Sequence, residues 1–212
     1  MHTVKAALIA STLVALSGCS GDGELLATGV RATRSACPSV AIPAATGDVT
    51  VFNPPSSRDA RAIDVVANIT NLRSTCDETG ANIVTNATFE VQGQRRDATG
   101  DREVVLPYFA TVVQGGNNVV SKRIGRVALR FANGQLRAST RGTATGQVLR
   151  SAATLPDDVR RQITRERKPG DADAALDPLA DPTVRAAVTR ASFEFLVGFQ
   201  LTPEQLAYNA TR

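Results

Sequence analysis

The strongest constraint on the fold is an alternation of apolar and polar residues that recurs in segments between Asp48 and Leu149. Successive side chains of a β-strand point to opposite faces, so a period of two indicates strands with one buried face. The apolar positions that follow this period are Ile63, Val65, Ala67 and Ile69; Ile83, Ala87, Phe89 and Val91; Val104, Leu106, Tyr108, Ala110 and Val112; and Val127, Leu129 and Phe131. The pattern therefore predicts a largely antiparallel sheet with one face toward a core.

Turn-forming residues separate these segments. Residues 77–80, residues 115–118 and the pair Asn133-Gly134 lie between them. Asn133-Gly134 predicts a two-residue type I′ hairpin, which needs positive φ at both positions. Short strands joined by tight turns predict an all-β fold, and we expect an antiparallel β-sandwich, immunoglobulin-like or fibronectin-like, with about seven strands.

The C-terminal part predicts one more core strand and a short helix. Five apolar positions at strict period two run from Phe193 to Leu201, and we expect them to form the closing strand of the sheet. After it, Thr202 is followed by proline and then, three positions on, by Gln205. This spacing is a capping box and predicts a terminal helix.

A change of period between residues 156 and 190 predicts a helical insertion before the last strand. Residues 157–168 read as a helix, with Val159 and Ile163 four residues apart. Asp181-Pro182 is a suitable N-cap and first-turn pair for a second helix that ends at Arg190. A segment rich in Pro, Asp and Ala separates the two helices. We expect the insertion to lie on the surface.

The first residues have the three zones of an export signal. A short segment with Lys5 precedes an apolar run from Ala6 to Leu16, and small residues follow it. The apolar run is about half of the roughly 20 residues that a membrane-spanning helix needs. We therefore expect residues 1–18 to be a cleaved signal peptide.

The sequence Leu16-Ser17-Gly18-Cys19 resembles the lipobox of bacterial lipoproteins. The resemblance implies that Cys19 receives lipid, that cleavage occurs before it, and that its new amino group is acylated. Several acyl chains on one residue suffice for stable membrane anchoring. In such lipoproteins an aspartate after the cysteine favours retention in the inner membrane. Ser20 at this position implies the outer membrane, with the domain facing the periplasm of the cell envelope.

Lipidation of Cys19 would leave an even pair among the three cysteines. Cys37 and Cys76 are then expected to form a disulfide in an oxidising compartment. The alternative is two free or metal-bound thiols, although metal sites need more ligands at close spacing. Residues 19–36 are rich in Gly, Ala, Ser and Thr and predict a lipidated cysteine followed by a flexible tether. Residues 37–212 are expected to form a single sandwich domain with the helical insertion.

The composition excludes several kinds of chemistry. The only histidine is His2, in the predicted signal, so we expect neither a Ser-His-Asp triad nor a histidine-ligated metal. No glycine-rich phosphate loop is present, and we expect no cofactor. The formal net charge of +4 and the scattered arginines do not favour nucleic acid. A Ser121-Lys122 dyad lacks a matching motif, and no small-molecule substrate is indicated.

Two groups of charged residues are weaker candidates for a functional site. The pairs Asp157-Asp158 and Asp171/Asp173 could act as acid and base or bind calcium, although carboxylates at a helix start more often stabilise the helix dipole. Five basic residues crowd the predicted helix over residues 157–168. They form either a solvated face or a contact, through Arg160, Arg161 and Arg165, with an anionic envelope surface.

The segment FEFLVGFQLTPEQLAYN at Phe193 to Asn209 resembles the ending of small, uncharacterised lipoproteins of Gram-negative bacteria, some of which share the Cys37-Pro38 pair. This resemblance implies a β-rich envelope lipoprotein and no particular activity. The leading hypothesis is a non-enzymatic, lipid-anchored structural or protein-interaction module with an envelope protein as partner. The alternatives are a cell-wall glycan- or lipid-binding module and a histidine-free hydrolase.

Overall fold

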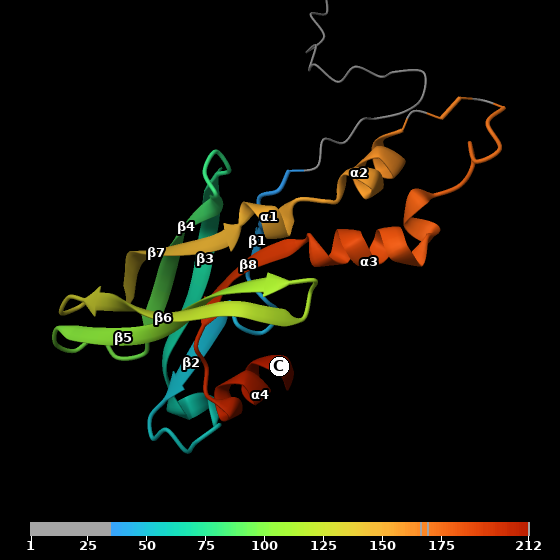
Figure 1. Ribbon diagram of the computed structural model, residues 1–212. Helices are drawn as coiled ribbons and strands as arrows, with labels where there is room; N and C mark the ends of the chain where they lie inside the picture. Colours follow the sequence, from blue (N-terminus) through green and yellow to red (C-terminus); the bar gives the residue numbers. More distant parts are fainter. Residues whose placement is uncertain (1–34, 166, 169, 212) are drawn as a thin grey trace, which may run out of the picture.

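Eight β-strands form two four-stranded sheets that pack face to face in the computed structural model, which describes residues 35–165, 167–168 and 170–211 (Figure 1). The first sheet has the order β1-β8-β5-β6 and the second sheet the order β2-β3-β4-β7. The strands are β1 (Ser39–Ala41), β2 (Asp48–Phe52), β3 (Ile63–Asp77), β4 (Asn82–Arg95), β5 (Arg102–Gln114), β6 (Asn118–Phe131), β7 (Arg137–Leu149) and β8 (Phe193–Phe199). This arrangement confirms the predicted all-β sandwich.

The core lies between the two sheets and is made by the residues that the alternation predicts to face inward. The second sheet contributes side chains that are almost completely buried, among them Val65, Ala67, Ile83, Phe89 and Val91. The first sheet contributes Leu106, Val112, Leu129, Phe131 and Phe195. Burial of each large apolar side chain stabilises the fold by roughly 1.5–3 kcal/mol, so this interface between the sheets holds the domain together.

The final strand lies inside the first sheet, whereas we expected it to close the sheet. β8 pairs antiparallel with β5 on one side and parallel with β1 on the other. The parallel partner β1 is three residues long, too short to show an alternation, so the sequence did not reveal it. The sandwich therefore has one strand more than the seven or so expected, and one parallel pair in an otherwise antiparallel structure.

The predicted turns at residues 115–118 and 133–134 differ in what they connect. Gly115 and Gly116 both have positive φ (62° and 84°) and join β5 to β6 in a hairpin, as predicted. The prediction of a type I′ hairpin at Asn133-Gly134 is wrong, because only Gly134 has positive φ (80°). The backbone N–H of Gln135 donates to Ala132 O (2.9 Å), and the turn carries the chain from β6 in one sheet to β7 in the other.

The insertion between β7 and β8 is longer than the predicted 156–190 and begins with α1 (Arg150–Ala153), which precedes the two helices α2 (Asp157–Thr164) and α3 (Pro182–Arg190). Asp181 caps α3, since its Oδ1 accepts a hydrogen bond from the backbone N–H of Thr183 (2.7 Å). The first predicted helix ends four residues earlier than expected. Residues 164–168 contain no apolar side chain that could continue the buried face of α2 beyond Ile163, and packing rather than propensity sustains most short helices.

The terminal helix α4 (Pro203–Thr211) has the predicted capping box. The backbone N–H of Thr202 donates to Gln205 Oε1 (2.9 Å), and the N–H of Gln205 donates to Thr202 Oγ1 (3.3 Å). The helix is also fixed to the sandwich, because Asn209 Nδ2 donates to the carbonyl oxygens of Asp48 (2.8 Å) and Ala45 (3.0 Å).

One fully buried arginine joins two of the four connections that cross between the sheets. Arg95, at the end of β4, is 1% exposed, and its guanidinium lies 5.3 Å from the centre of the Phe131 ring. It donates four hydrogen bonds, of 2.7–2.9 Å, to backbone carbonyls: Gln135 O, Gly100 O, Ala98 O and Ala132 O. Two of these carbonyls belong to the β4–β5 connection and two to the β6–β7 connection. The side chain therefore holds both crossovers in place.

We expect Arg95→Leu to lower the free energy of unfolding by about 2–4 kcal/mol, since four carbonyls lose a hydrogen bond from the guanidinium and the two crossovers lose the side chain that joins them. Urea unfolding followed by circular dichroism measures this change. The exposed neighbour Arg96 supplies the control, and Arg96→Leu should change stability by less than about 0.5 kcal/mol. Equal effects of the two substitutions would show that Arg95 does not organise the crossovers.

Candidate functional site

Four connections of the chain meet at one end of the sandwich, which we call the helical end (Figure 1). It comprises Cys37, the β3–β4 turn (residues 78–81), the β5–β6 turn (residues 115–117) and the helices α1 to α3. The insertion leaves the sandwich after Leu149, which pairs with Asn82 at the start of β4. It returns at β8, whose second residue Glu194 pairs with Ser39 at the start of β1. The described chain therefore enters the sandwich beside the helices.

Cys37 and Cys76 form the predicted disulfide at this end. The bond joins the chain just ahead of β1 to β3, and thus links one sheet covalently to the other. The two cysteines are 39 positions apart. Closing a loop of this size stabilises a fold by about 4 kcal/mol in the chain-entropy model. The disulfide therefore fixes the point at which the N-terminal segment joins the domain.

The short helix α1 attaches the insertion to the β3–β4 turn. The backbone N–H of Arg150 donates to Ala81 O (2.9 Å), and its guanidinium Nη1 donates to Glu78 O (3.3 Å) and Thr79 O (3.2 Å). Ala153 at the end of α1 is buried in the main core. The first turn of the insertion therefore has a defined position on the sandwich.

Helices α2 and α3 pack on each other through a small apolar cluster of their own. Its buried members are Val159, Val184 and Ala187, and partly buried side chains of Leu155, Ile163 and Val188 surround them. Val159 and Ile163 are the residues whose spacing predicted the first helix. The cluster holds the two helices together beyond the edge of the main core and turns their charged faces toward solvent.

The three arginines predicted to contact an anionic surface lie close together but have different environments. Arg160 forms an ion pair with Asp157 one turn earlier (2.8 Å), and Arg165, beyond the end of α2, pairs with Asp173. Although partial desolvation opposes it, the positive charge of Arg165 holds the pKa of Asp173 below its usual range. In the described part of the chain, Arg161 has no carboxylate within ion-pair distance.

Three of the four carboxylates considered as acid, base or calcium ligands are engaged in local interactions. Asp157 and Asp173 pair with arginines, and Asp171 Oδ2 accepts a hydrogen bond from the backbone N–H of Lys168 (3.0 Å). Among the residues that the structure describes, no group of three His, Cys, Asp or Glu side chains is placed to hold a metal ion. None of the described helices has the length and hydropathy needed to cross a bilayer.

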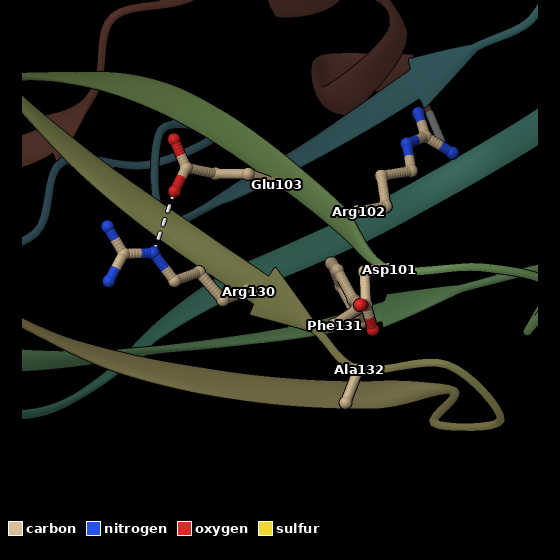
Figure 2. A pocket seen from close by; sticks show the side chains of 6 residues that line it. All are labelled: Asp101, Arg102, Glu103, Arg130, Phe131 and Ala132. Carbon is tan, nitrogen blue, oxygen red and sulfur yellow. Dashed lines mark hydrogen bonds and ion pairs between the residues drawn. The ribbon is translucent and has the colours of Figure 1, made fainter.

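A hollow of about 420 Å³ lies at the other end of the sandwich (Figure 2). β4 runs from one end of the sandwich to the other, since Thr85 near its start pairs with Cys76 and Arg95 is its last residue. At about 3.3 Å per residue, the 14 residues of this strand separate the two ends by roughly 45 Å. The hollow is lined by Asp101, Arg102, Glu103, Arg130, Phe131 and Ala132. Arg130 pairs with Glu103 (2.7 Å), as Figure 2 shows, and Arg102 forms a bidentate pair with Asp64 (2.7 and 2.5 Å). Both cations are neutralised, which leaves no free charge for an anionic ligand.

The sequence did not single out a further surface on β6. Its first seven residues, Asn118 to Ile124, are all exposed on both faces, and three of them are large aliphatic residues. A break in the sequence pattern could have indicated this surface, because the alternation that identifies the core positions of β6 begins only at Val127. Ser121 and Lys122, weighed as a catalytic dyad, are exposed members of this segment.

Comparisons with protein-family models, with curated proteins and with solved structures found no match to this chain.

The pair Asp64–Arg102 should make the stability of the fold depend on pH. Hydrogen bonds from Arg102, opposed by partial burial, hold the pKa of Asp64 below its usual range. A carboxyl group whose pKa is lowered on folding stabilises the fold above its unfolded pKa of about 3.9, and this contribution is lost as the pH falls through the folded pKa. We expect Asp64→Asn to cost about 1 kcal/mol at pH 7 and progressively less below pH 4.

Urea unfolding of both proteins between pH 3 and pH 7 measures this difference. Glu103→Gln is the matched control, because the pair Arg130–Glu103 is far more exposed (82% and 46%) than Arg102 and Asp64 (39% and 15%). It should have an effect within about 0.5 kcal/mol at every pH. A difference between wild type and Asp64→Asn that stays constant down to pH 3 would contradict the assignment.

Proposed function

We propose that this protein is a lipid-anchored component of the cell envelope whose β-sandwich is a non-enzymatic protein-interaction module. The lipobox-like sequence that ends at Cys19 carries the proposal. This cysteine lies outside the residues that the structure describes. In the proposed mature protein the lipid holds the chain to the outer membrane, with Ser20 as the residue that follows the anchor, and the sandwich faces the periplasm.

The disulfide Cys37–Cys76 supports this proposal in two ways. Disulfides persist in oxidising compartments such as the bacterial periplasm and are rare in the cytosol. The pairing also accounts for two of the three cysteines and leaves Cys19 for a separate role. A lone cysteine between a short apolar run and a polar segment fits covalent attachment of lipid.

The helical end is the part of the domain that we place toward the membrane. The described chain enters the sandwich there, so a lipid attached 18 residues ahead of Cys37 would keep this end closest to the bilayer. Among the described residues Arg161 on α2 has no ion-pair partner, and Leu176 (65% exposed) and Leu179 (43% exposed) lie in the same insertion. An insertion that carries both cations and exposed aliphatic side chains is suited to an anionic lipid surface.

The anchor is tested by Cys19→Ala, since without the thiol no lipid can be attached. We expect the variant to appear in the soluble fraction of the envelope or to keep its uncleaved signal. Membrane fractionation, mass spectrometry of the N-terminal peptide and immunodetection of the full-length chain measure this outcome. Cys37→Ala is the control for loss of a cysteine and should remain in the membrane. A fully processed, membrane-bound Cys19→Ala protein would refute the anchor.

Orientation is tested by reversing the three charges on the insertion. The unlipidated mature chain that begins at Ser20 should bind vesicles containing phosphatidylglycerol. The triple variant with Arg160→Glu, Arg161→Glu and Arg165→Glu should bind these vesicles at least tenfold more weakly. The reason is that each basic residue near an anionic bilayer contributes about 1 kcal/mol to binding. Vesicle co-sedimentation measures the affinity.

The control for this experiment carries the same change of charge elsewhere. Arg73→Glu, Arg137→Glu and Arg141→Glu alter exposed residues of the second sheet and should leave vesicle binding close to that of the wild type. If both triple variants bind equally well, the insertion does not face the membrane. That result would leave the anchor at Cys19 untouched.

A further inference from the structure

The two sheets have four outer edges, and the structure protects two of them, at β1 and β2. β1 is only three residues long, and short edge strands offer little backbone for another chain to pair with. Helix α4 covers the edge at β2: Asn209 donates to the carbonyl of Asp48, and the ring of Tyr208 contacts Phe52 edge-on at 5.2 Å. The β7 edge is long, but of its residues Leu149 alone is a large exposed aliphatic one, and the carbonyl of Thr143 accepts a hydrogen bond from the hydroxyl of Tyr108 in the first sheet (2.6 Å).

The edge formed by β6 is long, and its first half is exposed without interruption. All residues from Asn118 to Ile124 are exposed, including Val119 (59%), Val120 (51%) and Ile124 (53%). In the described part of the chain no element lies beyond β6 in its sheet. Exposed aliphatic side chains on a long edge strand are unfavourable in isolation and are typical of a strand that accepts a partner.

The hydrogen bonds of the neighbouring strand show which backbone groups of β6 are available. Pro107 of β5 accepts a hydrogen bond at its carbonyl from Gln200 N (2.9 Å), on the β8 side of the sheet, so its cross-strand partner Arg126 directs its N–H and C=O away from β5. Ser121 is an odd number of residues from Arg126, so its backbone groups point the other way, toward β5. Its carbonyl accepts a hydrogen bond from Thr111 Oγ1 of β5 (2.8 Å). The N–H and C=O groups of Lys122, Ile124 and Arg126 therefore point to the free edge.

The side chains of these same three residues lie on the outer face of the sheet, where the aliphatic Ile124 stands between the cations Lys122 and Arg126. Lys122 lies over the ring of Phe109 at 5.4 Å, and neither it nor Arg126 has a carboxylate partner among the described residues, whereas Arg130 is paired with Glu103. A second copy of this strand is disfavoured, because antiparallel pairing about Ile124 would place each Lys122 opposite an Arg126. Like charges that face each other across a strand pair are destabilising.

We infer that the free edge of β6 binds an extended acidic segment of a partner protein, which adds to the first sheet as an antiparallel strand. The segment carries Asp or Glu two positions before and two positions after an aliphatic residue, so that the acids lie opposite Lys122 and Arg126 and the aliphatic residue lies opposite Ile124. Main-chain hydrogen bonds supply affinity in this mode of recognition, and the side chains supply specificity. The inference rests on the proposed interaction function and names its surface and the chemistry of its partner.

A synthetic peptide with the repeat Glu-Thr-Val-Thr-Glu at its centre tests the inference, with Lys-Thr-Val-Thr-Lys as its matched control. Fluorescence anisotropy with the unlipidated mature chain should show saturable binding of the acidic peptide and at least tenfold weaker binding of the basic one. Hydrogen exchange should slow at the amides of Lys122, Ile124 and Arg126 when the acidic peptide is bound.

Two variants separate the backbone from the charge. Ile124→Pro removes a backbone donor that points to the free edge and should abolish binding. Lys122→Glu with Arg126→Glu preserves the backbone and should reverse the preference toward the basic peptide. Circular dichroism and urea unfolding establish that each variant is folded. The double charge variant keeps the test decisive if proline destabilises the strand.

Three results would overturn the inference: equal binding of both peptides, no binding of either, or dimerisation of the chain through β6. A fourth is binding of anionic vesicles that Ile124→Pro leaves unchanged while neither peptide binds, since this would assign the exposed aliphatic residues to a lipid surface. Membrane anchoring is measured separately through Cys19, so a failure of the edge and a failure of the anchor are distinguishable.

Discussion

The buried guanidinium of Arg95 is the interaction on which the arrangement of the two sheets depends. A sandwich needs its chain to cross from one sheet to the other, and here two such crossovers lie side by side at one end. Arg95 binds carbonyls of both, and in the part of the chain that the structure describes no carboxylate is buried with it. Taking a charge out of water is costly unless hydrogen bonds replace the lost hydration, and four carbonyl dipoles do so here. A shift of β4 by one residue would turn this side chain to solvent, so the charge also fixes the register of the strand.

The two ends of the sandwich are consequently built in different ways. At the Arg95 end, short crossovers, paired charges and a buried cation make a closed structure whose polar groups are largely occupied by one another. At the helical end, a disulfide and a short helix attach an insertion that has its own small core and unbalanced positive charge. Side chains that are already paired have little to offer a partner. Exposed aliphatic residues accompany open backbone groups on β6, and they accompany cations in the insertion at the helical end.

The sequence predicted those parts of the fold in which each residue responds to its nearest neighbours. Alternation identified the inward faces of β3 to β6, and capping residues located the starts of α3 and α4. It failed where a distant partner decides the outcome. Asn133-Gly134 has hairpin chemistry, but the strands on either side belong to different sheets. β1 forms because its backbone pairs with β8, and its three residues are too few to show an alternation of apolar and polar side chains. In the sequence, Arg95 is only an arginine that falls on the inward face of β4, two residues after Gly93. Two of the carbonyls that it binds, those of Ala132 and Gln135, are distant in the sequence and could not be predicted from it.

Among the predicted site residues, the pairing of Cys37 with Cys76 followed from counting cysteines and is confirmed.

The pairing also determines where mechanical load enters the domain. A pull on the chain ahead of Cys37 reaches the disulfide before it reaches β1, and passes through a covalent bond into β3, in the middle of the second sheet. The three-residue strand β1, which would otherwise peel from β8 one hydrogen bond at a time, is shielded from that force. The domain can thus be held by its N-terminal segment without that segment beginning to unfold it.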